Sequence, residues 1–120
     1  MFSKRRTEIK RLKSKQAIDR LFSEGTHFGK GPIKLVCDTQ KGKGLVLGFG
    51  VSKRLFPKAV DRNKIKRLMR EQSRIICSGP LHTPFEGNGF FVYNAQKLPS
   101  LDTIEKAMLP LLKSWGNLQQ

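Results

Sequence analysis

The chain has 120 residues, a formal net charge of +15 and a pI near 10.5. A chain of this length forms one domain with a modest core, and such a charge favours a polyanionic partner, above all a nucleic acid. No apolar stretch approaches the roughly 18 residues of a membrane span, and two cysteines are too few for a disulfide scaffold.

Cys37 and Cys77 lack Cys-x-x-Cys spacing and are not accompanied by clustered histidines. We therefore expect two reduced, buried cysteines in a cytoplasmic protein that has no metal of its own and no contact with a membrane. The positive charge is localised, because residues 75–120 hold as many acidic as basic side chains and the whole excess lies in residues 1–74. The sequence thus predicts a basic surface patch.

Residues 1–13 are basic and lack a periodic apolar pattern, which indicates a flexible arm that becomes ordered on nucleic acid. Ser14 is a candidate N-cap for a short helix, and Gly25 is a candidate C′ residue at its end. The apolar face of this helix comprises Ala17, Ile18, Leu21 and Phe22.

Two strands are expected next, at 33–38 and 45–52, because apolar and polar or small residues alternate in both. The turn-forming residues 39–44 separate them. Gly48 and Gly50 fall on the same side of the second strand and make that side unusually flat. Glycine within a strand often marks a close approach, by either a packed helix or a nucleic acid here.

A strongly basic helix follows a Pro-containing turn. At about 100° per residue, one arc of about 140° contains Arg62, Lys66, Arg70, Asn63, Arg74 and Arg67. The opposite side carries the core-facing stripe Ile65, Leu68, Met69, Ile75 and Ile76. Like charges at i,i+4 cost a few tenths of a kcal/mol per pair, so this face favours a phosphate-bearing partner over an ordinary solvated surface.

The rest of the chain is predicted to contain a loop at 78–88, a buried strand at 90–94 and a final helix at 100–115. Asp102 and Glu105 have the spacing of a capping box, and Pro110 should kink or divide the helix. The element order α, β, β, α, β, α predicts a single α+β domain over residues 1–120, with helices packed on a small sheet.

Residues 48–71 resemble the signature of the bacterial ribonuclease P protein component. Val51-Ser52-Lys53-Arg54 matches the strand end V-S-K-[KR], and residues 59–71 match the helical motif A-V-x-R-N-[RK]-x-[KR]-R-x-x-R-[EQ]. The resemblance implies an α-β-β-β-α-β-α sandwich on a mixed sheet, with a further short strand near residues 26–29. It also implies a left-handed βαβ crossover, whereas handedness rules alone predict a right-handed one.

The same resemblance implies a protein subunit without catalytic residues, in an endonuclease whose RNA subunit binds Mg²⁺ and removes the 5′ leader of precursor tRNA. Its partners would be that catalytic RNA and precursor tRNA. The residues implied to face the catalytic RNA are Lys53, Arg54, Arg62, Asn63, Lys64, Lys66, Arg67 and Arg70. Those implied to line a cleft for the single-stranded leader are Ile18, Phe22 and Val36.

The chain departs from the family pattern at three places. Lys64 stands where the motif often has Arg, and it keeps the charge without the bidentate fork. The loop at 55–58 lacks a frequent glycine and looks one residue longer. Ile18 and Val36 stand where relatives are often aromatic, which leaves Phe22 to stack with bases, although a Phe on an amphipathic helix also suits a core.

Two rival functions remain open from the sequence. A protein-only nuclease would need gathered carboxylates or a His–acid pair, yet the nine acidic residues are dispersed and His27 and His82 are isolated. A structural ribosomal protein is the second alternative, because basic α+β domains with arms are typical of that class. The role of Asn63 is also open from the sequence. Its amide could form a hydrogen bond to RNA, or it could bond the loop before the basic helix to that helix.

Overall fold

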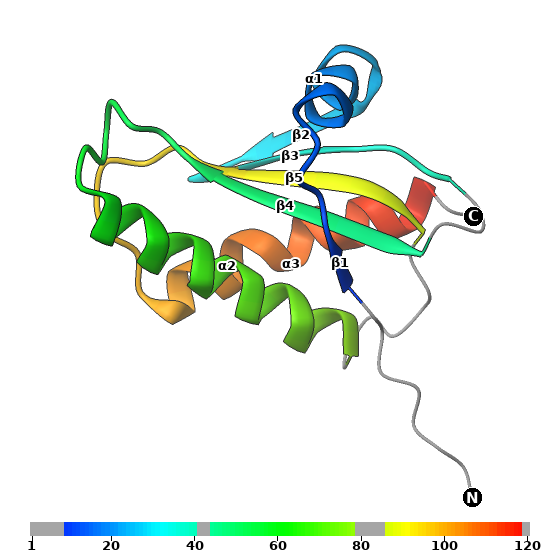
Figure 1. The fold of residues 1–120 in the computed structure, drawn as a ribbon. Helices are drawn as coiled ribbons and strands as arrows, with labels where there is room; N and C mark the ends of the chain where they lie inside the picture. Colours follow the sequence, from blue (N-terminus) through cyan, green and yellow to red (C-terminus); the bar gives the residue numbers. More distant parts are fainter. Residues whose placement is uncertain (1–8, 41–43, 79–85, 119–120) are drawn as a thin grey trace, which may run out of the picture.

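The computed structural model describes residues 9–40, 44–78 and 86–118, and within them one mixed sheet has the strand order β1-β4-β5-β3-β2 (Figure 1). The strands are β1 (Ile9–Arg11), β2 (Thr26–Lys30), β3 (Ile33–Cys37), β4 (Leu45–Val51) and β5 (Gly87–Tyr93). β4 is parallel to both β1 and β5, whereas β3 is antiparallel to β5 and to β2. The short strand expected near residues 26–29 is therefore confirmed as β2.

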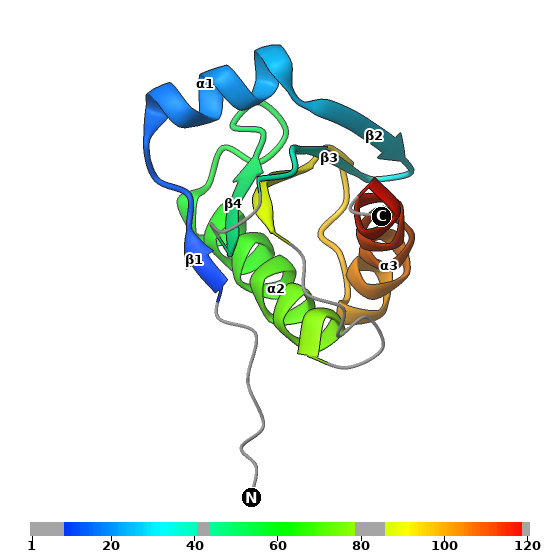
Figure 2. The same cartoon turned by 90° about the vertical axis from the view of Figure 1, so that its right-hand side faces the viewer.

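Three helices pack on the sheet in the described part of the chain. α1 (Lys15–Glu24) lies on one face, and α2 (Ala59–Ser78) and α3 (Leu101–Leu118) cover the other (Figure 2). The α+β class predicted from the sequence is confirmed. Among the described residues, no helix is long and apolar enough to cross a membrane.

The main core fills the space between the sheet and the helices α2 and α3. Side chains from all of these elements are fully buried there, including Ile33, Leu35, Leu45, Leu47, Ile65, Met69, Phe91, Tyr93, Ile104, Met108, Leu112 and Trp115. Burial of each large apolar side chain contributes about 1.5–3 kcal/mol relative to exposure. A second, smaller core beneath α1 holds Leu12, Leu21 and Val36.

The crossover from β4 through α2 to β5 is left-handed. The hand is seen when the sheet is viewed from the side of α2, with the parallel strands β4 and β5 pointing upward. In this view β5 lies to the left of β4, and the two orthogonal views in Figures 1 and 2 agree on this. Right-handed connections dominate parallel βαβ units, so general rules alone point the wrong way here. The expectation drawn from the family resemblance is correct.

The expected basic arm ends earlier than residue 13. Ile9–Arg11 forms β1 along the edge of β4, with Ile9 opposite Leu45 and Arg11 opposite Leu47. The backbone N–H of Leu12 then donates to the carbonyl of Leu47, and the Leu12 side chain is buried. The prediction was wrong for these residues because strand pairing with a distant partner leaves no local pattern; residues 1–8 lie outside the described residues.

The two ends of α1 were predicted with unequal success. Ser14 is the N-cap, because its Oγ accepts a hydrogen bond from the backbone N–H of Ala17 at 3.2 Å. Gly25 follows the helix, but its φ of −77° is extended and not left-handed. A Cβ at Gly25 would lie 2.6 Å from the carbonyl oxygen of Leu21, so close packing and not handedness favours glycine there.

The start of α3 uses a different cap from the one predicted. The Oγ of Ser100 accepts from the backbone N–H of Thr103 at 3.2 Å and lies 3.0 Å from the Thr103 hydroxyl. Ser100 is thus the capping residue, in place of the Asp102 and Glu105 pair. The helix continues through Pro110 as one element and is not divided there.

The prediction that Ile75 belongs to the core-facing stripe of α2 is wrong. Ile65, Met69 and Ile76 are buried, but Ile75 is 55% exposed. The buried arc of α2 runs from Gln72 through Ile76 to Cys77, and Ile75 lies about 60° outside it on the side of Gln72. Gln72 and Ser73 occupy the buried arc instead, and the Ser73 hydroxyl donates to the carbonyl of Met69.

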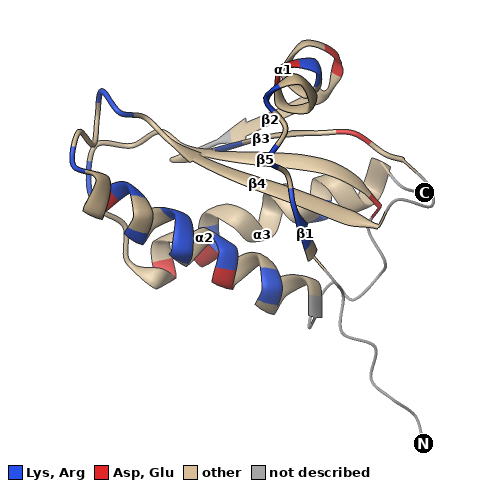
Figure 3. Cartoon of the chain, in the orientation of Figure 1, with Lys and Arg blue, Asp and Glu red and all other residues tan. Residues whose placement is uncertain are grey.

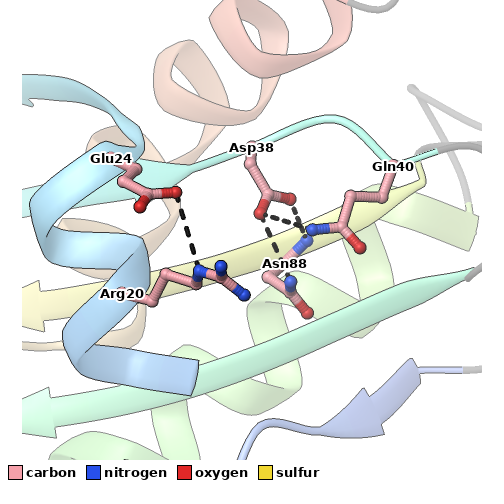
Figure 4. Close-up of polar contacts among 5 residues, drawn as sticks. All are labelled: Arg20, Glu24, Asp38, Gln40 and Asn88. Atoms are coloured by element: carbon pink, nitrogen blue, oxygen red, sulfur yellow. Dashed lines mark hydrogen bonds and ion pairs between the residues drawn. The ribbon is translucent and has the colours of Figure 1, made fainter. Parts of the chain in front are cut away.

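Asp38 connects three elements at one end of the sheet (Figure 4). Its carboxylate accepts from the backbone N–H of Asn88 at 2.8 Å, from the Asn88 amide at 3.3 Å and from the Gln40 amide at 3.0 Å. Its backbone carbonyl accepts from the indole N–H of Trp115 at 2.9 Å. The end of β3 is therefore fixed to the start of β5 and to α3, while the ion pair of Arg20 with Glu24 in the same view is exposed.

Both cysteines are buried, as the sequence predicted, and neither forms a disulfide bond. Burial raises the pKa of the Cys77 thiol to about 12. Burial, followed by the neighbouring charge of Asp38, raises the pKa of Cys37 to about 12. Because the thiolate is the reactive form, both side chains are inert at neutral pH and act as small apolar core residues.

Candidate nucleic-acid interface

The cationic surface of α2 follows from the way the helix packs. Ile65, Met69 and Ile76 are buried on one side, so the basic residues of α2 lie around the rest of the helix, where Figure 3 shows the basic positions along the ribbon. We call this surface the basic face and define it by Arg62, Asn63, Lys66, Arg67, Arg70 and Arg74. Lys64 is exposed as well, but it lies about 100° beyond Asn63 on the helix and so outside this arc.

Arg62 has an internal structural role that the sequence did not reveal. Its Nη1 donates to the carbonyl of Phe56 at 2.9 Å and to that of Pro57 at 2.8 Å. These bonds tie the loop before α2 to the helix. Phe56 is itself buried against Tyr93, with ring centroids 6.0 Å apart, so the loop has a fixed position.

Asn63 is exposed, and its side chain makes no hydrogen bond within the part of the chain that the structure describes. The tie between loop and helix that Asn63 might have provided is made by Arg62 instead. The Asn63 amide is therefore free to bind a partner.

The other end of the loop presents two predicted site residues. The backbone N–H of Phe56 donates to the carbonyl of Ser52 at 2.9 Å, and this turn leaves Lys53 and Arg54 exposed at the end of β4. Basic residues thus continue from α2 along the loop to the end of β4, as the blue segments of the ribbon indicate (Figure 3).

Arg70 is partly held by an aromatic contact. Its guanidinium carbon lies 5.9 Å from the centroid of the Phe49 ring, and Phe49 stacks on Phe91 at 5.8 Å. A cation over an aromatic face gains about 0.5–2 kcal/mol and fixes the orientation of the side chain. Arg70 is half-buried as a result, and its charge has a defined position on the basic face.

The predicted leader-cleft residues lie together, but they differ in accessibility. Phe22 is 38% exposed, Ile18 is half-buried and Val36 is only 3% exposed. Val36 belongs to the small core beneath α1, where it offers almost no surface to a base. The Phe22 ring meets that of His27 edge to face, and the His27 Nε2 lies 3.0 Å from the carbonyl of Phe22. His82 lies outside the described residues.

Phe90 on β5 is the site residue that the sequence reasoning missed. Its ring meets Phe22 at 5.5 Å with an interplanar angle of 64° and extends over Gly48 and Gly50 of the neighbouring strand. A Cβ at Gly48 would lie 2.6 Å from the ring, and one at Gly50 would lie 2.9 Å away. The flat side of β4 is thus occupied by Phe90, which settles what approaches the two glycines.

A groove of about 480 Å³ connects the basic face to Phe90, whose ring contacts Phe22. It runs beside β1 and β4. Its lining includes cations from two elements and apolar side chains from both faces of the sheet: Lys10, Arg11, Lys66, Arg70, Arg74, Ile18, Phe49 and Phe90. Lys10 and Arg11 reach this groove because β1 holds them at the edge of β4. The arrangement suits a nucleic-acid strand, whose phosphates need cations and whose bases need aromatic or apolar surfaces.

Comparison with known proteins identifies similar chains. Residues 7–113 match the family model described as Ribonuclease P. The ribonuclease P protein component of Chlorobaculum tepidum is 40% identical over a region that covers 62% of this chain and 55% of that protein. The chain therefore spans about half the length of this curated relative.

Solved structures agree in fold. The ribonuclease P protein of Staphylococcus aureus matches with a TM-score of 0.73 at 24% identity, covering 87% of this chain and 93% of that one. The protein of Thermotoga maritima matches with a TM-score of 0.72 at 21% identity, covering 88% and 96%. The likeness extends over nearly the whole of the described fold.

Proposed function

Because this chain belongs to the ribonuclease P protein family, we propose that it is the protein subunit of a ribonucleoprotein endonuclease that matures the 5′ end of tRNA. In this proposal the RNA subunit is the catalyst, and the protein binds both that RNA and the 5′ leader of precursor tRNA in the cytoplasm. The observation that carries it is the groove that joins the cations of α2 to Phe90, whose ring contacts Phe22 of α1.

The basic face is the docking surface for the RNA subunit in this proposal. Lys53, Arg54 and Lys64 add exposed charges around it, and the groove supplies Lys10 and Arg11 as well. Each cation that neutralises a phosphate releases condensed counterions, which gives affinity without sequence selectivity. The protein would thereby hold the RNA subunit in a fixed orientation to the leader.

Mg²⁺ would be held by the RNA subunit and would supply the metal chemistry of phosphodiester hydrolysis. In the described part of this chain, no three His, Cys, Asp or Glu side chains lie close enough together to hold a metal ion. The role of the protein is then to position a single strand and to reduce repulsion between two polyanions. Both roles need cations and aromatic rings in place of acid–base pairs.

The test is reconstitution with the RNA subunit encoded by the same genome. We expect precursor tRNA to be cleaved at the 5′ end of the mature sequence when RNA, protein and Mg²⁺ are combined. The protein and Mg²⁺ without the RNA should give no cleavage. Cleavage by the protein alone would support a protein-only nuclease, and co-purification with ribosomal subunits, without an effect on tRNA cleavage, would support a structural ribosomal protein.

Asn63→Ala should weaken docking to the RNA subunit by about 1–2 kcal/mol, because a hydrogen bond to a charged partner is lost. The melting temperature should change little, since the Asn63 side chain is exposed and bonds to no described residue. Filter binding and thermal unfolding of the free variant check the two parts. A large fall in melting temperature with intact affinity would assign Asn63 to the fold.

Arg62→Gln provides the contrast, because it removes the bonds to the carbonyls of Phe56 and Pro57. This variant should lose stability as well as affinity.

A further inference from the structure

We propose that Phe90 is the surface on which a base of the single-stranded leader stacks, with Phe22 as the side wall of that site. This inference rests on the proposed function, because it assigns a residue to the binding of the leader. Phe90 is half-buried and has a place on the groove lining, so part of its ring is accessible from the groove.

The position of the Phe90 ring is fixed by the backbone around it. β5 pairs with β4 on one side and with β3 on the other, and Phe90 is in register with Gly48 and Val36. The ring extends over β4, because hypothetical Cβ atoms at Gly48 and Gly50 would both collide with it, at Cδ1 and Cε1 and at Cε2 and Cζ respectively. The ring therefore fills the space that side chains at these two positions of β4 would otherwise occupy.

Phe22 limits the site from the side of α1. Its ring meets Phe90 edge to face at 5.5 Å, so Phe22 does not cover the Phe90 ring in a parallel stack. Ile18 completes the wall and has no π-face, and Val36 is buried below. Of the two rings in this contact, Phe90 lines the groove and Phe22 does not, so Phe90 is the one placed to support a base there.

The surrounding charges favour a nucleic-acid strand over another flat ligand. Lys66 and Arg70 of α2 line the same groove as Phe90, and Lys10 and Arg11 line it from β1. Cations that follow a backbone, combined with an aromatic ring for the bases, are the pattern of single-strand binding without strict sequence selectivity. The occupant is therefore a leader nucleotide whose phosphates lie toward α2.

The test compares the affinities of precursor and mature tRNA for the reconstituted holoenzyme. Phe90→Leu keeps an apolar side chain and removes the π-face, so the ratio of precursor to mature affinity should fall about 5- to 100-fold. Phe90→Tyr keeps the ring and should keep the ratio. Mature tRNA, which has no leader, should bind all variants equally.

Phe28→Leu is the matched control, because Phe28 packs against the main core on the other face of the sheet. It should leave the ratio unchanged, and thermal unfolding of each free protein separates binding from stability. Phe22→Leu should reduce the ratio less than Phe90→Leu does. If Phe90→Leu folds and retains the ratio of the unsubstituted protein, Phe90 is a packing residue and the inference is wrong.

A spectroscopic measurement on the unsubstituted protein does not depend on the folding of any variant. Precursor tRNAs carrying 2-aminopurine at successive leader positions should show additional quenching at one position when the protein joins the complex. Absence of such quenching at every leader position would overturn the inference. If the unsubstituted holoenzyme does not prefer precursor over mature tRNA, the proposed function itself is wrong. This outcome is distinguishable from a failure of the inference about Phe90 alone.

Discussion

Replacing Lys66, Arg67 and Arg74 together by Gln should weaken binding of the RNA subunit by about 10²- to 10³-fold near 0.1 M salt. Each cation that neutralises a phosphate contributes about 0.7–0.9 to the slope of log K against log salt, so the magnitude of the slope should fall by about two to three. These three side chains carry charge on the basic face and form no hydrogen bond, ion pair or aromatic contact with the described residues. Affinities measured over a salt series give the slope directly.

Arg62 and Arg70 are left intact in this variant because they also support the structure. Arg62 binds the loop carbonyls, and Arg70 lies over Phe49, so their removal would combine folding and binding effects. A matched control replaces Lys97, Lys106 and Lys113, three exposed lysines of the C-terminal part of the chain, by Gln. This control removes the same amount of charge from outside the basic face, so the slope of log K against log salt should be nearly unchanged. Equal slopes for the two triple variants would reject the basic face as the RNA contact.

Gly87→Ala should destabilise the protein by about 3 kcal/mol or more and lower the melting temperature by roughly 10 °C or more. Gly87 has a φ of +137°, and an added Cβ would lie 2.3 Å from the backbone carbonyl oxygen of Asp38. That oxygen already accepts the indole N–H of Trp115, so it cannot move away without breaking this bond. Backbone strain and a backbone collision therefore act together.

Gly31→Ala separates the two causes. Gly31 also has a positive φ, of +76°, but a Cβ there would meet no atom within 4 Å. Only the left-handed backbone is penalised, at a cost of about 1–2 kcal/mol. Urea unfolding of both variants gives the comparison, and equal losses of stability would mean that crowding at Asp38 contributes nothing.

Helix α2 could be predicted because the residue pattern that specifies it lies within its own sequence. Apolar residues at i, i+3 and i+4 set the buried side of a helix wherever it packs, and the basic face then follows from the same 3.6-residue period. Ile65 and Met69 behave in this way. The error at Ile75 arose from counting an apolar residue as buried although Ser73 and Gln72 lie closer to the buried arc.

Features that depend on distant partners were not predictable from local patterns. β1 exists because three residues pair with β4, and the roles of Arg62 and Arg70 depend on the loop carbonyls and on Phe49. Phe90 and Phe91 are adjacent and equally apolar, so the sequence cannot say which one faces the groove. The register of Gly48 with Phe90 decides it, because only a residue without a side chain leaves room for the ring.

The strand order has a consequence for how this protein folds during its synthesis. β5 lies between β3 and β4, yet it is made after both, and the core also needs α3, which is made last among the described elements. While the ribosome adds these residues, β3 and β4 have no strand between them, and the strongly basic first part of the chain is already outside. Sheet formation must wait for long-range pairing, which is slow compared with local folding. The polycationic first part of the chain therefore cannot complete its sheet before β5 has been made.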